Sequence, residues 1–147
     1  MNILKIKKLR DNAVIPTRST PGSAGMDMYA CIDSPYILEP GAIALIPTGV
    51  AIELDSCGVV AYLFARSGLS VKHGISLANG VGVIDSDYRG EVCAAMINNS
   101  SVSYTITPGE RIAQMVISPV IIPQIDIVDE LADSSRGEGG FGSTGKL

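Results

Sequence analysis

The apolar residues of this chain fall in short runs, and Gly, Pro, Asn or Asp interrupts nearly every run. Such windows are too short to show the period of a helix, and they favour strands joined by turns. We expect one helical stretch, residues 67–73, starting from a serine cap. Many short strands separated by turns predict an all-β sandwich, jelly roll or closed barrel. The predicted strands are residues 3–7, 25–31, 36–38, 42–46, 50–54, 59–64, 75–79, 91–98, 103–106, 112–119 and 124–128.

The pattern changes after Ile127, where VDELADSSRGEGG loses most apolar residues and becomes first acidic and then glycine-rich. A chain of 147 residues is one domain's worth and can bury about two-thirds of its unfolded surface. We therefore predict a β domain at residues 1–128 and a flexible, glycine-rich C-terminal arm at residues 129–147.

Charge and hydropathy exclude several classes of function. The formal net charge of −4 argues against a general nucleic-acid binder, which would present a basic face. Pro or Gly cuts the longest apolar stretches well short of a membrane span. The opening residues, MNILKIKKLR, lack the continuous apolar core of a signal peptide. We expect a cytoplasmic protein that binds neither nucleic acid nor membrane.

The cysteines and the single histidine offer little chemistry. Cys31, Cys57 and Cys93 are odd in number and lack metal-ligand spacing, so we expect buried, reduced thiols rather than disulfides or a zinc site. His73 has no nucleophile elbow near it, and we expect a surface or capping role. A divalent ion, if one is used, would arrive with the phosphates of a substrate.

Residues 79–92, NGVGVIDSDYRGEV, are the most informative internal stretch and read as a hairpin. Gly80 and Gly82 lack side chains, so a flat ring such as a pyrimidine could lie against the backbone. We expect the apolar Val83 and Ile84 to be buried. Asp85 follows them directly, and its carboxylate could take a proton from water at the edge of a pocket. Plain turn residues remain an alternative for both aspartates of this stretch.

Arginines concentrate near turns although the chain as a whole is acidic. Arg66, Ser67 and Gly68 stand where a strand ends and the short helix begins, a combination suited to an anion. Arg111 and Gln114 open another strand, and an ordinary surface pair with Glu110 is the alternative for Arg111. A further group, suited to a polyphosphate, lies in the terminal arm: Arg136, Ser143 and Thr144.

Five stretches taken together, in one order along the chain, resemble the trimeric deoxyuridine triphosphatases (dUTPases). They are AGMDMYA at 24–30, ARSGLS at 65–70, NGVGVIDSDYRGEV at 79–92, GERIAQMVI at 109–117 and RGEGGFGSTG at 136–145. The resemblance implies a jelly-roll-like β-barrel, a homotrimer with active sites shared between chains, and hydrolysis of dUTP to dUMP and pyrophosphate. Such an enzyme lowers dUTP and supplies dUMP for thymidylate synthesis.

The same resemblance implies how the reaction runs. Asp85 would be the catalytic residue, orienting and deprotonating the water that attacks the α-phosphorus. Mg²⁺ would be the cofactor, held mainly by substrate phosphates and water rather than by side chains. Asp27 would support the site without ligating the metal directly.

Substrate-binding roles also follow from the resemblance. Asn79 and the backbone of Gly82, Val83 and Ile84 would read uracil, Tyr88 would pack on the deoxyribose and exclude a 2′-hydroxyl, and Cys93 would complete the base pocket. Arg66, Ser67 and Gly68 would bind phosphates, with Gln114 close to them. The arm would act as a lid, with Arg136 at the γ-phosphate, Phe141 over the uracil, and Gly142, Ser143 and Thr144 around the phosphates.

Two departures from the family pattern, Ala65 before the arginine and Met26 and Met28 beside Asp27, read as packing changes. Two other functions stay open from the sequence. A dCTP deaminase-like enzyme of the same fold would release ammonia, and a non-catalytic nucleotide-sensing regulatory protein would bind without turnover.

Overall fold

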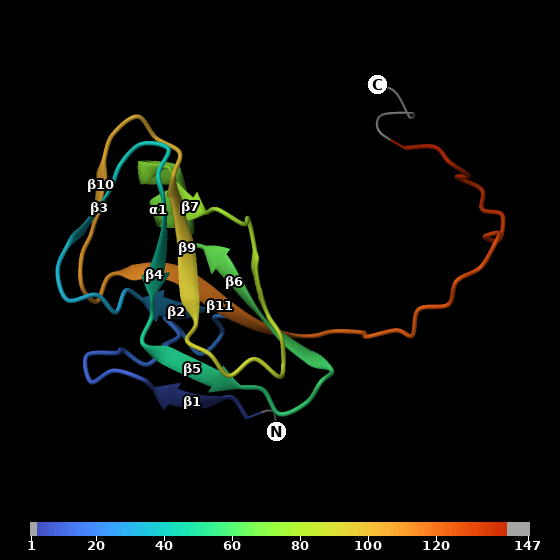
Figure 1. The fold of residues 1–147 in the computed structure, drawn as a ribbon, viewed down its shortest axis with the longest axis horizontal. Coiled ribbons are helices and arrows are strands. Elements are labelled where there is room, and N and C mark those ends of the chain that lie inside the picture. Colours follow the sequence, from blue (N-terminus) through green and yellow to red (C-terminus); the bar gives the residue numbers. More distant parts are fainter. Residues whose placement is uncertain (1–2, 141–147) are drawn as a thin grey trace.

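The chain folds into antiparallel β-sheets with one short helix, in a computed structural model that describes residues 3–140 (Figure 1). The N-terminal half contains β1 (Lys5–Lys8), β2 (Met26–Tyr29), β3 (Tyr36–Leu38), β4 (Ile43–Pro47), β5 (Val50–Glu53) and β6 (Val59–Ala65). The second half contains α1 (Ser67–His73), β7 (Ile75–Leu77), β8 (Gly82–Ile84), β9 (Cys93–Asn98), β10 (Tyr104–Ile106) and β11 (Arg111–Pro119).

Two larger sheets and two strand pairs make up the body. The four-stranded sheet has the order β2-β11-β6-β8, the three-stranded sheet has the order β4-β9-β7, and β1 pairs with β5 as β10 pairs with β3. Every pairing is antiparallel. Within the described residues these sheets stay open rather than closing into a barrel. The predicted all-β architecture is present, but the expected closure is not.

The core lies between the sheets, and methionine is prominent in it. Met28, Met96 and Met115 are fully buried, and Met26 is nearly so. An unbranched thioether side chain adapts to irregular gaps, which suits a core assembled from short strands of different sheets. Met26 and Met28 are therefore packing residues, as the sequence indicated.

Two sequence-based predictions about backbone are wrong. Residues 124–128, predicted as a strand, carry none in the described structure, and Ile125 and Ile127 are more than nine-tenths exposed. The supposed hairpin at residues 79–92 joins strands of different sheets, because β8 pairs with β6 while β9 pairs with β4 and β7. Residues 85–92 are thus a loop that crosses between the two larger sheets.

The helix occupies the predicted residues, but its capping differs from the expectation. Arg66 is the N-cap residue, with an extended backbone, and within the described residues no side chain caps this end. Ser67 is already the first helical residue. The helix ends at His73, and its C-cap residue Gly74 has a φ of 69°, the left-handed conformation that glycine adopts without strain.

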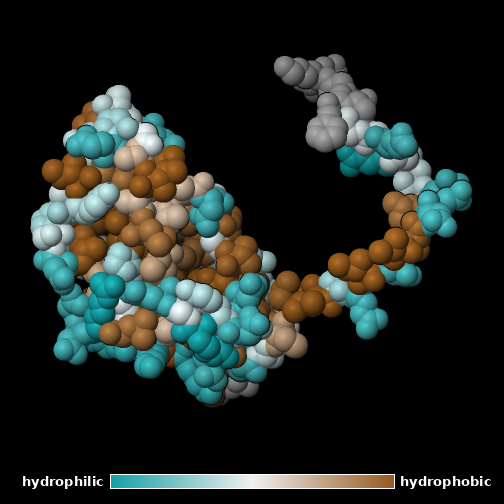
Figure 2. All heavy atoms as spheres, in the orientation of Figure 1, coloured by the Kyte–Doolittle hydropathy of each residue, from teal (hydrophilic) through white to brown (hydrophobic). Residues whose placement is uncertain are grey.

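Apolar side chains remain exposed on one face and along the segment after β11. Figure 2 shows apolar atoms gathered over the region of β4 and β9 and again along the extended segment. Ile43 and Leu45 of β4 are 62% and 68% exposed. In the segment, the exposed apolar residues are Ile121, Ile122, Ile125, Ile127 and Leu131. Surfaces of this kind mark contact sites for other protein chains.

Candidate active site

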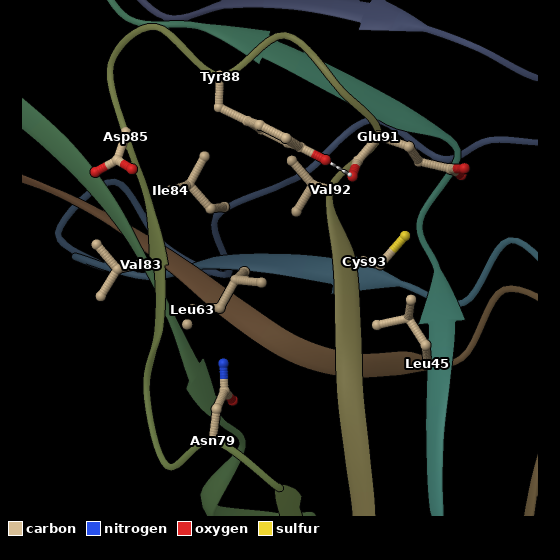
Figure 3. Close-up of a pocket in the computed structure, with 11 residues that line it drawn as sticks. Leu45, Leu63, Asn79, Val83, Ile84, Asp85, Tyr88, Glu91, Val92 and Cys93 are labelled. Atoms are coloured by element: carbon tan, nitrogen blue, oxygen red, sulfur yellow. Dashed lines mark hydrogen bonds between the residues drawn. The ribbon is translucent and has the colours of Figure 1, made fainter.

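A pocket of about 330 Å³ opens beside the loop that carries Asp85 (Figure 3). Its volume lies at the lower end of the range for small-molecule sites. It brings together seven of the predicted site residues, which are Asn79, Gly82, Val83, Ile84, Asp85, Tyr88 and Cys93. The loop crosses between two sheets, so β8 supplies one wall and β9 the opposite wall. Leu45, Leu63, Glu91 and Val92 complete the lining.

Close packing explains the glycine at the start of β8. A Cβ atom on Gly82 would lie 3.0 Å from the Cβ of Leu63, because β8 pairs with β6 at that point. Ile84 is buried on the same side, whereas Val83 is 61% exposed. The interpretation of Val83 as buried is therefore wrong. The strand borders the pocket, and the Val83 side chain lies on the opposite side of β8 from Ile84 and Leu63 (Figure 3).

Asp85 lies at the rim of this pocket, immediately after β8. Its residue is exposed, and its main-chain carbonyl accepts a hydrogen bond from the Tyr88 N–H at 3.2 Å. The turn thereby places Asp85 and Tyr88 on the same loop. In Figure 3 the Tyr88 ring points across the pocket toward Glu91, whereas the Asp85 carboxylate lies at the rim, on the same side of the strand as Val83. An exposed carboxylate at the rim of a pocket is open to water, which is one condition for a general base.

Tyr88 is held by its own loop. Its hydroxyl donates to the main-chain carbonyl of Glu91 at 3.0 Å, and its ring packs over Gly90. A Cβ atom on Gly90 would overlap the Tyr88 hydroxyl and ring, so glycine at that position makes room for the tyrosine. Tyr88 is 45% exposed, and it lines the pocket.

A second pocket, of about 400 Å³, gathers the other predicted residues. Asp27, Arg66, Ser67, Gly68 and Gln114 line it, together with Ser19, Ser23, Ala24 and Gly25. Among the described residues that line them, the two pockets share none. The second pocket contains an arginine, hydroxyls and an amide, which is the chemistry of an anion site.

Asp27 organises the second pocket. Its carboxylate is mostly buried and pairs with Arg66 Nε at 2.9 Å and Arg111 Nη1 at 3.1 Å. Arg66 also donates to the main-chain carbonyl of Arg111 at 3.4 Å. One carboxylate between two guanidinium groups fixes their orientation while leaving a local excess of positive charge. This supports the predicted supporting role of Asp27.

A β-bulge in β11 explains how Arg111 and Gln114 reach the same site. The pairing with β2 shifts between Arg111 and Ala113, and both Ile112 and Ala113 are fully buried. An extra residue in a strand breaks the alternation of faces, so Arg111 and Gln114 both point away from the core. Gln114 then lies opposite Asp27 and donates to the Ala65 carbonyl at 3.0 Å.

The suggested surface pair of Arg111 with Glu110 is wrong. Arg111 pairs with Asp27, while Glu110 accepts hydrogen bonds from the Tyr104 hydroxyl and from Thr107. Burial, followed by this contact with Glu110, raises the pKa of Tyr104 to about 12. The role of Arg111 remains structural, but its partner belongs to the site. The side chain of His73 packs against Tyr104, with ring centroids 5.1 Å apart.

The arm residues lie apart from both pockets or outside the described chain. Residues 120–140 run away from the sheets in Figure 1, and in this described part Arg136 donates to the Gly139 carbonyl at 2.8 Å rather than to a pocket residue. The predictions for Phe141, Gly142, Ser143 and Thr144 fall on residues outside the described range.

The three cysteines differ in environment, and the expectation that all are buried is wrong for Cys57. Cys57 is exposed, Cys93 is half-buried in the first pocket, and Cys31 is buried. Burial raises the pKa of the Cys31 and Cys93 thiols, and the nearby carboxylate of Glu91 raises the pKa of Cys93 further. A raised pKa lowers the thiolate fraction at any given pH.

We therefore expect Cys57 to react first with an aromatic disulfide at neutral pH, roughly tenfold faster than Cys93 or Cys31, because only the thiolate attacks. Peptide mapping of the native protein by mass spectrometry after timed labelling would measure the three rates. A Cys57→Ser variant should lose the fast phase and keep the slow ones. Faster labelling at Cys93 than at Cys57 would contradict the described burial.

Several residues of the two pockets were missed from sequence. Glu91 stands inside the stretch that carries Asp85, and Ser19 and Ser23 precede the stretch that carries Asp27. Only their positions beside those motifs could have drawn attention to them, since neither glutamate in a turn nor serine in a loop is distinctive.

Neither a membrane span nor a metal cage emerges from the described residues. No helix among residues 3–140 is long and apolar enough to cross a membrane. In the same range, no group of three or more His, Cys, Asp or Glu side chains is arranged to hold a metal ion. Mg²⁺ commonly binds through substrate phosphates, waters and one or two carboxylates, a mode that needs no dedicated cage of side chains.

Comparison with known proteins identifies relatives along nearly the whole chain. The family model named dUTPase matches residues 11–145. A deoxyuridine 5′-triphosphate nucleotidohydrolase of Desulfitobacterium hafniense is 52% identical over 149 residues, covering 99% of both proteins. A protein of the same name from Hahella chejuensis is 54% identical over 139 residues, covering 95% of this chain and 91% of the relative.

Solved structures show the same likeness. A mutant dUTPase of Staphylococcus bacteriophage 80alpha with dUpNHpp has a TM-score of 0.90 and 32% identity, covering 99% of this chain and all of that one. A mutant dUTPase from phage phi11 of S. aureus, in a study of the coordination of a structural Mg(II) ion, has a TM-score of 0.81 and 28% identity, covering 90% of this chain and all of that one.

The fold and the relatives together define the class of the protein as an all-β, jelly-roll-like hydrolase. The chain belongs to the dUTPase family. The family and the jelly-roll-like fold that the sequence predicted are both confirmed.

Proposed function

We propose that the chain hydrolyses dUTP to dUMP and pyrophosphate, with Asp85 as the general base. The observation that carries the proposal is the placement of Asp85 and Tyr88 on one loop, at a pocket that also contains Asn79 and the backbone edge of β8. The names of the relatives, deoxyuridine 5′-triphosphate nucleotidohydrolase, support the same substrate.

Base recognition is assigned to the first pocket. The main-chain groups of Gly82, Val83 and Ile84 and the side-chain amide of Asn79 supply donors and acceptors for the edge of uracil. Tyr88 packs on the sugar, where its ring leaves no space for a 2′-hydroxyl. Cys93, on the opposite wall, completes the pocket. Exclusion by a ring held in place is effective because a close-packed wall yields little.

The chemical step transfers one proton and breaks one phosphorus–oxygen bond. Asp85 accepts a proton from a water molecule, the water oxygen forms a bond to the α-phosphorus, and the bond between that phosphorus and the bridging oxygen to the β-phosphate breaks. The products are dUMP and pyrophosphate. Mg²⁺ bound to the triphosphate supplies charge neutralisation on the phosphate oxygens.

The second pocket is assigned to the phosphates. Arg66, Ser67 and Gly68 bind phosphate oxygens, and Gln114 stands close to them. Asp27 keeps the Arg66 guanidinium pointed into this pocket, at 2.9 Å from Nε, so little reorganisation is needed as charge develops. Arg136 and the rest of the arm would close over the bound triphosphate as a lid.

The proposed assembly is a homotrimer in which each active site combines pockets of different chains. Two observations support it. The base pocket and the phosphate pocket of one chain have separate linings among the described residues, and apolar side chains such as Ile43 and Leu45 are exposed beside the base pocket. Burial of such a face against a second copy would remove it from water.

The proposed function predicts pyrophosphate release from dUTP but little from dTTP, dCTP or UTP in the presence of Mg²⁺. Excess EDTA should abolish the release, and added Mg²⁺ should restore it. A coupled assay for pyrophosphate, with ammonia measured in parallel, distinguishes the outcomes. Ammonia from dCTP would indicate a deaminase, and binding without turnover would indicate a sensor; either result would overturn the proposal.

A further inference from the structure

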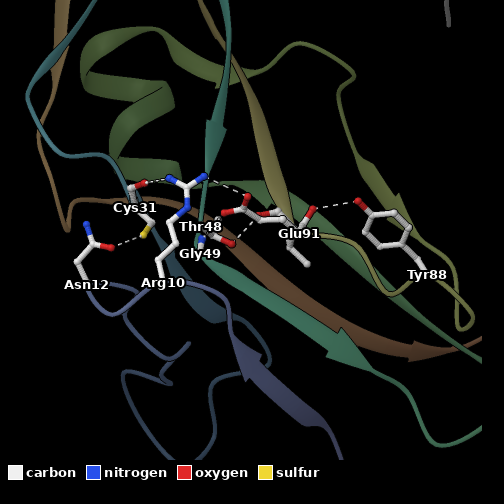
Figure 4. Close-up of polar contacts among 8 residues, drawn as sticks. Arg10, Asn12, Cys31, Thr48, Gly49, Tyr88 and Glu91 are labelled. Atoms are coloured by element: carbon white, nitrogen blue, oxygen red, sulfur yellow. Dashed lines mark hydrogen bonds and ion pairs between the residues drawn. The ribbon is translucent and has the colours of Figure 1, made fainter.

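The side chain of Glu91 joins the loop that carries Asp85 and Tyr88 to two other parts of the chain (Figure 4). Its Oε1 accepts a hydrogen bond from the Gly49 N–H at 2.8 Å, and its Oε2 accepts one from Arg10 Nη2 at 3.3 Å. Only 23% of the Glu91 side chain is exposed, so these contacts are shielded from water better than a surface ion pair.

Both partners of Glu91 are themselves fixed. Arg10 Nη1 donates to the Cys31 carbonyl at 3.2 Å. The Gly49 carbonyl accepts from the Leu9 N–H at 2.7 Å, which ties the segment after β1 to the turn between β4 and β5. The carboxylate of Glu91 therefore binds to a rigid support rather than to another mobile loop.

The main chain of Glu91 completes the connection to Tyr88. The Tyr88 hydroxyl donates to the Glu91 carbonyl, so the orientation of this one peptide group sets where the phenol lies. Contacts of the side chain on one side and of the carbonyl on the other leave the Glu91 residue little freedom. Loss of the carboxylate would leave this peptide group anchored only through its other end, the Val92 N–H bonded to the Val50 carbonyl, so the carbonyl and the tyrosine ring would be freer to shift.

The rest of the loop does not depend on Glu91. Val92 keeps its own contacts when the carboxylate is lost: its N–H, in the same peptide group as the Glu91 carbonyl, donates to the Val50 carbonyl at 2.8 Å, and its carbonyl accepts from the Thr48 N–H at 3.2 Å. Asp85 follows directly from β8, which is paired with β6. Removal of the Glu91 carboxylate should thus disturb Tyr88 more than Asp85, and it should leave the fold in place.

We propose that Glu91 is a positioning residue for sugar discrimination. Through Gly49 and Arg10 its carboxylate fixes the carbonyl that holds Tyr88, and so sets how strongly the enzyme prefers deoxyribose to ribose. The inference rests on the proposed function, in which Tyr88 packs against the deoxyribose. The relevant measure is the ratio of kcat/KM for dUTP to kcat/KM for UTP.

The test compares Glu91→Ala and Glu91→Gln with wild type. In Glu91→Ala we expect this ratio to fall at least about tenfold, since displacement of a positioning group by about 1 Å changes rates by as much as 10²-fold. The fall should come mainly from faster use of UTP. Glu91→Gln keeps an acceptor for the Gly49 N–H but loses the charge facing Arg10. Its ratio of kcat/KM for dUTP to that for UTP should therefore lie between the ratios of wild type and Glu91→Ala.

A matched control removes a different carboxylate that also links β5 to the N-terminal segment. Glu53 pairs with Lys5 at 2.6 Å on the exposed side of β1 and β5. It lines a separate pocket with Arg89 of the loop but forms no hydrogen bond to the loop among the described residues. Glu53→Gln should leave the ratio unchanged. A similar fall in Glu53→Gln would mean that general loosening of this region, rather than the Glu91 contact, controls the preference.

A second measurement tests whether Glu91 acts through Tyr88. Tyr88→Phe removes the hydroxyl that contacts the Glu91 carbonyl and keeps the ring. In that background, Glu91→Ala should change the ratio by less than about twofold, because coupled residues are not additive. An equal fall in both backgrounds would overturn the inference.

The outcomes separate this inference from the proposed function. A wild-type protein that does not hydrolyse dUTP would refute both. Wild-type hydrolysis with the expected preference, together with an unchanged ratio in folded Glu91→Ala, would refute only the role of Glu91. Should Glu91→Ala fail to fold, Glu91→Gln and Arg10→Gln test the same contact, and unchanged ratios in both would overturn the inference.

Discussion

Replacement of Asp85 by asparagine is expected to slow dUTP hydrolysis by about 10²–10⁴-fold, the usual contribution of a general base. Asparagine has nearly the same shape, so it can still orient a water molecule but cannot accept its proton. The substrate should bind almost as tightly as to wild type. Steady-state kcat, together with calorimetric titration of a non-hydrolysable dUTP analogue, measures the two effects separately.

The same loop offers a matched control. Asp87 is also exposed and lies two residues further along, but it does not belong to the pocket lining among the described residues. Asp87→Asn makes the identical chemical change and should retain a rate close to that of wild type. Equal losses in the two variants would mean that the negative charge of the loop matters rather than a base at Asp85. Full turnover in Asp85→Asn would remove Asp85 from the mechanism.

Removal of the arm is expected to have the other large effect. A chain ending at Ser135 loses Arg136 and the glycine-rich residues after it, which are assigned to closure over the triphosphate. We expect kcat/KM for dUTP to fall by roughly 10²-fold or more, as when a preorganised charge contact is lost. The fold and the proposed trimer should persist, because within residues 3–140 the buried core contains no residue beyond Met115. Light scattering and circular dichroism would check both.

A shorter truncation serves as the control for the arm. Removal of residues 146–147 alone leaves every arm residue with an assigned role and should not alter the rate. Full activity in the chain that ends at Ser135 would show that the arm is only a tail. Loss of the trimer in that variant would instead assign the arm to assembly, and the lid proposal would then fail.

Local sequence patterns were sufficient to predict most strands, because turn residues mark the ends of these strands. Residues 36–38 and 67–73 coincide with β3 and α1, and most other predicted strands overlap observed ones. The strand prediction for residues 124–128 was wrong although Ile125 and Ile127 alternate with polar residues as they would in a strand. A strand also needs a neighbouring strand to pair with, and the local pattern does not show whether one is present. Pairing is non-local, which is also why the loop at 85–92 read as a hairpin.

The site could be assembled from sequence only through the order of the five motifs. Spacing alone could not place Asp27 between Arg66 and Arg111, since that contact depends on the bulge in β11. The sequence likewise did not reveal that the residues assigned to the base and those assigned to the phosphates line two separate pockets. Glu91 was missed because its role arises from contacts with Arg10 and Gly49, which lie 81 and 42 residues away along the chain.

Gly49 illustrates how far from the substrate an intolerant position can lie. Its φ is 71°, and a Cβ atom there would stand 2.6 Å from both the Ala13 Cβ and the Cys31 Sγ. Every other amino acid would suffer backbone strain and a clash together. In a saturation-mutagenesis screen for activity, Gly49 would therefore score like an active-site residue. The scores of such a screen rank positions by how poorly they tolerate substitution. At Gly49 the low tolerance reflects the lack of space for a Cβ atom rather than contact with the substrate.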